Sequence, residues 1–141
     1  KIHNIHMQYF AMNNAAQALA QKGDLDKAED YATRALNMAE ANDDKLVMSG
    51  VYLTLGIIHR SRKDFSKAIN DFNKSILLME ILDIPFDRAQ AQYNLGETYI
   101  EMNELEEAGE ILKIAKATFE ELGSKKELET VKSLLKRTRE N

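Results

Sequence analysis

A unit of about 40 residues recurs three times in the sequence and constrains the fold more than any other feature. In each copy an alanine is preceded by an apolar residue three places earlier and by a small residue twelve places earlier. The alanines are Ala28, Ala68 and Ala108, the apolar residues are Leu25, Phe65 and Leu105, and the small residues are Ala16, Gly56 and Gly96. Three copies in register over about 120 residues predict a repeat protein, in which each unit packs on the next.

Each unit has the pattern of two antiparallel helices, so the predicted fold class is all-α. The chain has 141 residues, the length of one domain, and its one proline and six glycines are too few for a β-rich fold. The pairs Gly23-Asp24, Lys63-Asp64 and Asn103-Glu104 mark the turns inside the units. Asp24 and Asp64 are expected to cap the helices that follow, and a left-handed backbone at Lys63 would carry strain. The predicted helices span residues 3–22, 25–41, 44–62, 65–82, 85–102, 105–121 and 125–139.

These helices predict one domain over residues 1–141, built as a right-handed α-solenoid. Its three hairpins cover about residues 3–42, 43–82 and 83–122, and a C-terminal capping helix covers about residues 124–139. The small residue of each unit, such as Gly56, is expected to let the two helix backbones approach closely. Pro85 suits a first helical turn, where its missing N–H is not needed. Because the chain opens with Lys1 rather than Met, we expect it to be a piece of a longer protein or a processed product.

Charge and composition exclude several classes of function. Nineteen Lys and Arg stand against twenty-three Asp and Glu, a net charge of −4, so the basic surplus of a general nucleic-acid binder is missing. No apolar run approaches the ~20 residues that span a bilayer, so no membrane partner is predicted. The absence of cysteine removes disulfides, thiolate nucleophiles and cysteine-based zinc sites. The predicted location is the cytoplasm.

The residues around the repeated positions resemble the tetratricopeptide repeat family. The third unit shows the family pattern best, with Leu95-Gly96, Tyr99, Ala108, Leu112 and Ala115. The second unit has Tyr52, Leu55-Gly56, His59, Ala68 and Phe72, with Ser75 where alanine is usual, and the first unit is degenerate. The family period is about 34 residues. The longer period of this chain resembles the repeats of LGN/Pins-type adaptors, kinesin light chains and bacterial peptide-sensing regulators.

The resemblance implies an extended concave face, lined by the first helix of each hairpin. The residues expected on it are counted from the small residue of each unit. In the first unit they are Asn13, Asn14 and Gln17, with Ala20 and Gln21. In the second they are Leu53, Thr54, Ile57 and Arg60, with Ser61. In the third they are Gln90, Tyr93, Asn94 and Glu97, with Ile100 and Glu101.

We expect this groove to bind a peptide or helix of a protein partner. Asn14 and Asn94 occupy equivalent positions, and a carboxamide both donates to and accepts from the backbone of an extended peptide. Leu53, Ile57 and Tyr93 add apolar surface, which on a monomer often marks an interaction site. The alternatives are that the two asparagines cap or bridge neighbouring helices, and that Leu53 and Ile57 are ordinary core residues.

No catalytic site, cofactor or metal is predicted. A carboxylate clamp of the kind that holds chaperone C-termini needs Lys and Arg in the groove, where this chain has Asn13 and Asn94. His3 and His6 stand three places apart but lack a third ligand with recognisable spacing. His59 takes a position that usually holds tyrosine, which indicates a packing role. No nucleophile motif or glycine-rich phosphate loop occurs.

The favoured function is therefore a non-enzymatic scaffold for protein–protein interaction. A second hypothesis makes the same repeats the regulatory or sensor arm of a larger signalling or transcription regulator. A third makes them a self-association module that forms a homo-oligomer through its terminal repeats. In that case the outer face of the first helix, with Ile2, Ile5 and Tyr9, stacks on another copy.

Overall fold

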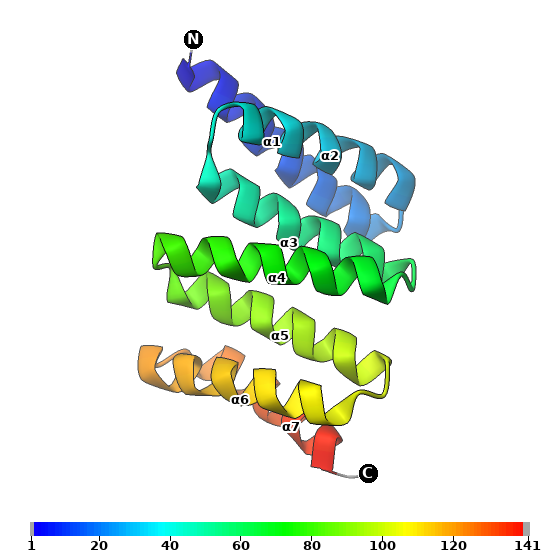
Figure 1. Cartoon of the computed structure of the whole chain (residues 1–141), viewed down its shortest axis with the longest axis vertical. Coiled ribbons are helices and arrows are strands. Elements are labelled where there is room, and N and C mark those ends of the chain that lie inside the picture. Colours follow the sequence, from blue (N-terminus) through cyan, green and yellow to red (C-terminus); the bar gives the residue numbers. More distant parts are fainter. Residues whose placement is uncertain (1, 140–141) are drawn as a thin grey trace. The chain divides into compact units, whose positions relative to one another are not determined.

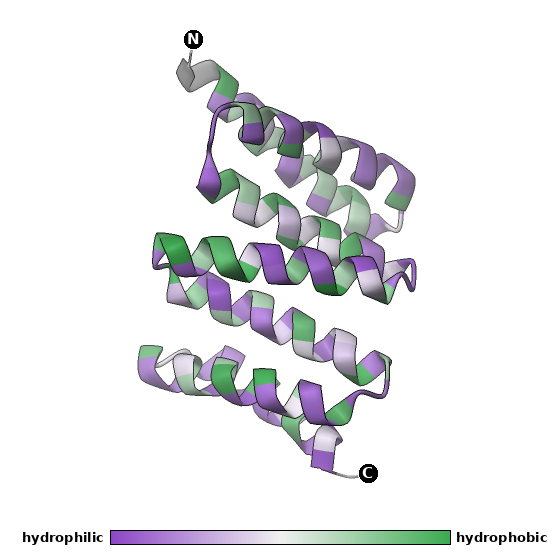
Figure 2. Ribbon diagram, viewed as in Figure 1, coloured by the Kyte–Doolittle hydropathy of each residue, from purple (hydrophilic) through white to green (hydrophobic). Residues whose placement is uncertain are grey.

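The computed structural model describes the backbone of residues 2–139 and the side chains of residues 5–139. This part of the chain forms seven α-helices and no strand, which confirms the all-α helical-repeat fold (Figure 1). The helices are α1 (Ile2–Lys22), α2 (Leu25–Ala41), α3 (Lys45–Ser61), α4 (Phe65–Leu82), α5 (Pro85–Glu101), α6 (Leu105–Leu122) and α7 (Lys125–Arg139). Every boundary lies within one residue of its predicted place. Each helix carries both hydrophobic and hydrophilic residues, as a helix with one buried face does (Figure 2).

A residue with a left-handed backbone follows each of the first six helices. These residues recur at an even spacing, as Gly23 (φ 88°), Asp43 (50°), Lys63 (65°), Asp83 (54°), Asn103 (61°) and Gly123 (70°). The next N–H then donates to the carbonyl five residues back, as Asp64 does to His59 at 2.9 Å. The strained geometry expected at Lys63 is present. Asp24 and Asp64 accept from the N–H of Lys27 and Lys67 at 3.4 Å, which confirms both predicted caps.

The chain forms two compact units, residues 1–78 and residues 79–141. In the first unit, α2 packs against both α1 and α3. The buried face of α2 consists of alanines, which bring the neighbouring helices close, and Tyr9, Val51 and Ile58 fill the core around them. These alanines are Ala28, Ala32, Ala35 and Ala39.

In the second unit, α6 packs against both α5 and α7. Its core combines small residues with large ones. The small residues are Ala89, Ala108 and Ala115, and the large ones include Leu112, Phe119 and Val131. Phe86 adds an edge-to-face contact with Phe119, with the ring centroids 5.8 Å apart. The helices of each unit are therefore held by apolar packing in which alanine sets the spacing.

Two glycines mark the closest approach of the helices within hairpins. A Cβ added to Gly56 would lie 2.5 Å from the Phe72 ring, and one added to Gly96 would lie 2.5 Å from the Leu112 side chain. Both distances are far below van der Waals contact, so a larger residue would force these side chains to shift. This confirms the prediction that the small residues let the helix backbones approach.

Helix α7 has the register of the first helix of a repeat, because α3, α5 and α7 begin at the evenly spaced residues Lys45, Pro85 and Lys125. It buries Val131, Leu134 and Leu135 in the core of the second unit. The position that holds the close-packed glycine in α3 and α5 holds Lys136 in α7, and this side chain is exposed. The apolar residues of α7 therefore cover α6. The side of α7 on which the second helix of a hairpin would pack carries the charged Lys136.

Candidate binding surface

Helices α1 and α3, the first helices of repeats one and two, pack on each other. Their side chains line an open hollow of about 320 Å³. Its lining residues are Gln17, Ala20, Gln21, Thr54 and Ile57. All five occupy positions expected to face the groove. The structure thus brings half of the residues predicted for the first two repeats together around one space.

Amide and hydroxyl groups give this hollow its polar character. Gln17 Nε2 donates to Thr54 Oγ1 at 3.3 Å, and the Thr54 hydroxyl donates to the Gly50 carbonyl at 3.1 Å. Thr54 is only 1% exposed, so its role is to position Gln17 rather than to offer surface. Gln21 is exposed and Ile57 is half-buried, and they present an amide and an apolar side chain respectively. The space therefore combines neutral hydrogen-bonding groups with apolar surface.

Other predicted groove residues of the first unit lie outside this lining. Asn13 is 8% exposed, and its Nδ2 lies 3.4 Å from the place a Cβ would take on Gly50, so it packs between α1 and α3. Asn14 is exposed but does not line the hollow. Leu53 and Arg60 are half-buried, and the Arg60 guanidinium lies 6.0 Å from the centre of the Phe72 ring.

A smaller hollow of about 110 Å³ lies in the second unit, where α5, α6 and α7 meet. Its lining residues are Gln90, Tyr93, Phe119, Lys126, Glu127 and Thr130. Gln90 and Tyr93 were predicted for the groove, but the contributions of α6 and α7 were missed. The repeat period could have predicted the contribution of α7. Thr130 stands one period after Gln90, so α7 continues the series of first helices.

Asn94 hydrogen-bonds within its own helix. Its Nδ2 donates to the Gln90 carbonyl at 2.9 Å, a bond inside α5 that neither caps a helix nor bridges two helices. Glu97 is half-buried, and neither it nor Asn94 lines the hollow of the second unit. A shared peptide-holding role for Asn14 and Asn94 thus stays a prediction.

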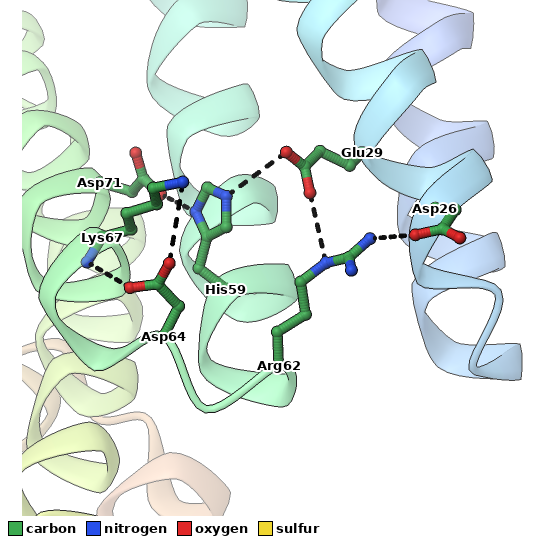
Figure 3. Close-up of polar contacts among 7 residues, drawn as sticks. All are labelled: Asp26, Glu29, His59, Arg62, Asp64, Lys67 and Asp71. Carbon is green, nitrogen blue, oxygen red and sulfur yellow. Dashed lines mark hydrogen bonds and ion pairs between the residues drawn. The ribbon is translucent and has the colours of Figure 1, made fainter.

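A polar network, buried at His59 and Asp71 and exposed at Asp26, joins α2, α3 and α4 within the first unit (Figure 3). His59 is 9% exposed, with Nδ1 2.5 Å from Asp71 Oδ2 and Nε2 3.7 Å from Glu29 Oε2. The other oxygen of Glu29 lies 3.3 Å from Arg62 Nε, and Arg62 Nη2 donates to Asp26 at 2.7 Å. His59 is buried as predicted, but it also bridges carboxylates from the two helices on either side.

Sequence reasoning missed Asp71, the closest partner of His59. Burial raises the pKa of the Asp71 carboxyl, and the hydrogen bond from His59 offsets this only in part. Comparison of the repeats could have identified the pair of His59 and Asp71. The equivalent positions of repeat one hold Leu19 and Tyr31. In repeat three they hold Tyr99 and Ile111, which pack on the apolar core there. The second repeat therefore has a hydrogen-bonded histidine and carboxyl group where the others have apolar or aromatic residues.

The start of α1 is tied to the start of α3 through Asp44. This residue caps α3 by accepting from the Val47 N–H at 3.2 Å, and it also accepts from the Tyr9 hydroxyl at 2.8 Å and from His6 Nδ1 at 2.5 Å. Burial acts to raise the pKa of the Asp44 carboxyl, but these hydrogen bonds outweigh it and lower the pKa. Tyr9 is 3% exposed, which corrects its placement on the outer face of the first helix.

In the sequence His3 and His6 lack a third metal ligand, and only His6 is among the described side chains. His3 and Ile2 lie outside them, and His6 is engaged with Asp44. Over residues 5–139 no group of three or more His, Asp or Glu side chains is placed to hold a metal ion. None of the described helices is long and apolar enough to cross a membrane.

The paired antiparallel helices of each unit define a helical-repeat protein. The tetratricopeptide repeat family model matches residues 8–80, and a second model of the same repeat matches residues 89–116. Since the first match alone covers more than half of the chain, the chain belongs to the tetratricopeptide repeat family. Members of this family typically mediate protein–protein interaction and are typically not enzymes.

Comparison with solved structures supports the fold. The crystal structure of BtubC (BKLC) from P. vanneervenii is similar, with a TM-score of 0.71 and 17% sequence identity. The similarity covers 93% of this chain and 63% of that one, so this chain spans less than two thirds of the length of its structural relative. At this identity the likeness shows the fold alone. A comparison with curated proteins gives no match.

Proposed function

We propose that the hollow between α1 and α3 binds an extended, uncharged segment of a protein partner. The observation that carries the proposal is the lining of this hollow, where the amides of Gln17 and Gln21 lie around Ile57 without a charged side chain. Amide groups hydrogen-bond the backbone of an extended peptide, which needs both donors and acceptors. Ile57 supplies apolar contact for one of its side chains.

The position of Thr54 supports the same function. Its hydroxyl is fixed by the Gly50 carbonyl and accepts from Gln17, so the Gln17 side chain is held in place before a ligand arrives. Such preorganisation lowers the entropic cost of binding. In the second unit, the hollow lined by Phe119 and Tyr93 offers space for an apolar side chain.

Peptide capture on an array of short peptides tests this proposal. The Gln21→Ala/Ile57→Ala variant is expected to bind the selected peptides about 30-fold more weakly, since one hydrogen bond and part of an apolar contact amount to ~2 kcal/mol. The matched control is Thr33→Ala/Asn37→Ala, which changes two exposed residues of α2 in the same unit. Circular dichroism must show equal helix content in all three proteins. Unchanged binding by the first variant, or capture of no peptide by the unmodified chain, would overturn the proposal.

A further inference from the structure

One side of α7 carries positive charge in a regular row. Its four residues stand four, three and four places apart, so they lie along one side of the helix, and all four are exposed. We call them the α7 row, and they are Lys126, Thr130, Ser133 and Arg137. The row has a cation at each end, two hydroxyl groups between them and no acidic residue.

The earlier first helices have no lysine or arginine at the positions of the α7 row. In α1, α3 and α5 the position of Lys126 holds His6, Leu46 and Phe86, and the position of Arg137 holds Gln17, Ile57 and Glu97. A terminal helix of a repeat protein needs a polar outer surface. This chain has more acidic than basic residues, so polarity alone does not account for a row whose only charges are positive.

The two cations of the α7 row are not neutralised within the described residues 5–139. Glu129, the exposed acid between them in the sequence, lies 3.7 Å from Lys132, which stands outside the row. No ion pair or hydrogen bond involves the side chain of Lys126 or Arg137. Both charges can therefore pair with anionic groups of a ligand.

The hollow of the second unit adjoins one end of the α7 row, because Lys126 and Thr130 line it. The side chains of Tyr93 and Phe119 give it apolar walls. Its volume of about 110 Å³ is below the ~150 Å³ of a cavity that holds benzene, so an aliphatic side chain fits it better than an aromatic one. The one acid in the lining, Glu127, is half-buried and opposes entry of a carboxylate into the hollow itself.

We propose that the second unit binds an acidic segment of a protein partner, which places an aliphatic side chain in the hollow and a carboxylate at each end of the α7 row. Lys126 and Arg137 are eleven residues apart. This separation is ~16 Å along the helix, which an extended segment spans with about five residues. We therefore expect two carboxylates about five residues apart. The inference concerns the second unit alone and does not rest on the hollow between α1 and α3.

A nucleic acid fits the α7 row less well than an acidic peptide. The phosphates of one strand recur every ~3.4 Å, so most of those between the two cations would lie beside hydroxyl groups without a positive partner. Helix α6, which packs on α7, would repel a continuous polyanion further. Its exposed acids are Glu106, Glu107, Glu110, Glu120 and Glu121.

NMR titration with synthetic peptides tests the charge requirement. The probe is an end-capped peptide of about eight residues with two aspartates five residues apart, a leucine two residues from one of them, and serine elsewhere. Both placements of the leucine are used. The better probe should bind ~10-fold more tightly than the same peptide with asparagines, since each surface ion pair strengthens binding by a factor of up to ~5. At ~0.5 M salt the difference should vanish.

A charge-reversal variant locates the binding site. Lys126→Glu/Arg137→Glu should abolish the preference for aspartate and should favour the same peptide with lysines in place of the aspartates. The matched control is Lys113→Glu/Lys136→Glu, which makes the same change in net charge at two exposed cations outside the row. It should keep most of the preference for aspartate. Equal loss in both variants would indicate a general charge effect and would overturn the proposal.

The hollow is tested separately from the charges. Leucine should improve binding of the probe ~5-fold over serine at the same position, and tryptophan should bind more weakly than leucine. Thr130→Phe, at an exposed position, fills the hollow and should remove the advantage of leucine while the preference for aspartate remains. Circular dichroism must show equal helix content in all variants. A thymidine strand of about eight nucleotides that binds more tightly than the probes, or no peptide binding at ~5 mM, would overturn the proposal.

Discussion

Replacing His59 alone with tyrosine is expected to lower the free energy of unfolding by about 3 kcal/mol, although tyrosine is the residue at the equivalent position of repeat three. The substitution leaves the buried Asp71 carboxyl, 8% exposed, without its hydrogen-bond partner at 2.5 Å. The double variant His59→Tyr/Asp71→Ile reproduces the Tyr99 and Ile111 pair. It is expected to lie within about 1 kcal/mol of the unmodified chain, because an apolar contact of similar size replaces a buried polar pair at little cost.

Urea denaturation of the unmodified chain, both single variants and the double variant measures the coupling between the two residues. The matched control is Glu29→Gln, which changes the more distant and more exposed partner of His59. Its effect should be below about 1 kcal/mol. If the double variant loses the sum of the two single effects, the pair is not interchangeable with an apolar contact, and the interpretation of the network is wrong.

Replacing Phe72 with alanine is expected to cost about 4 kcal/mol, because its fully buried ring fills the space beside Gly56. Gly56→Ala alone is expected to cost about 1 kcal/mol, since the clash with the ring outweighs the gain in helix propensity. In the double variant the new methyl group occupies part of the cavity. Its loss should therefore be at least ~1 kcal/mol smaller than the sum of the two single losses.

The first repeat provides the control for this pair. Ala16 and Ala32 occupy the positions of Gly56 and Phe72, and both are fully buried. Ala16→Gly should lower the free energy of unfolding by only about 1 kcal/mol, because glycine has the lower helix propensity and leaves a small cavity. Thermal or urea unfolding of the four variants gives the comparison. Strictly additive losses at Gly56 and Phe72 would contradict the direct contact between them.

The sequence predicted the helices well because the repeat period restricts every element at once. A turn recurs at every half period, and the alignment of three copies locates each turn even where the residue is unusual, as at Lys63. The close approach at Gly56 and Gly96 followed from the same comparison, since a contact between helices explains a small residue at that position in every copy.

The candidate site was predicted less completely because it depends on side-chain detail that the period does not contain. Adjacent helical residues differ by ~100° in direction, so Asn13 lies between α1 and α3 while Asn14 is exposed. The bond from Asn94 to the Gln90 carbonyl depends on a rotamer that no pattern specifies. His59 and Asp71 lie on different helices, so a local motif search could not pair them, although comparison of the repeats would have shown two polar residues at apolar positions.

Peptide binding in the hollow between α1 and α3 is tested most directly by the side-chain amide signals in NMR spectra. A peptide selected on the array is titrated into isotope-labelled protein, and the carboxamide resonances are followed. We predict that the signals of Gln17 and Gln21 shift with a common Kd, while those of Asn37 in α2 and Asn73 in α4 stay fixed. Shifts confined to Asn37 and Asn73 would place the ligand on the second helices and would contradict binding in the hollow.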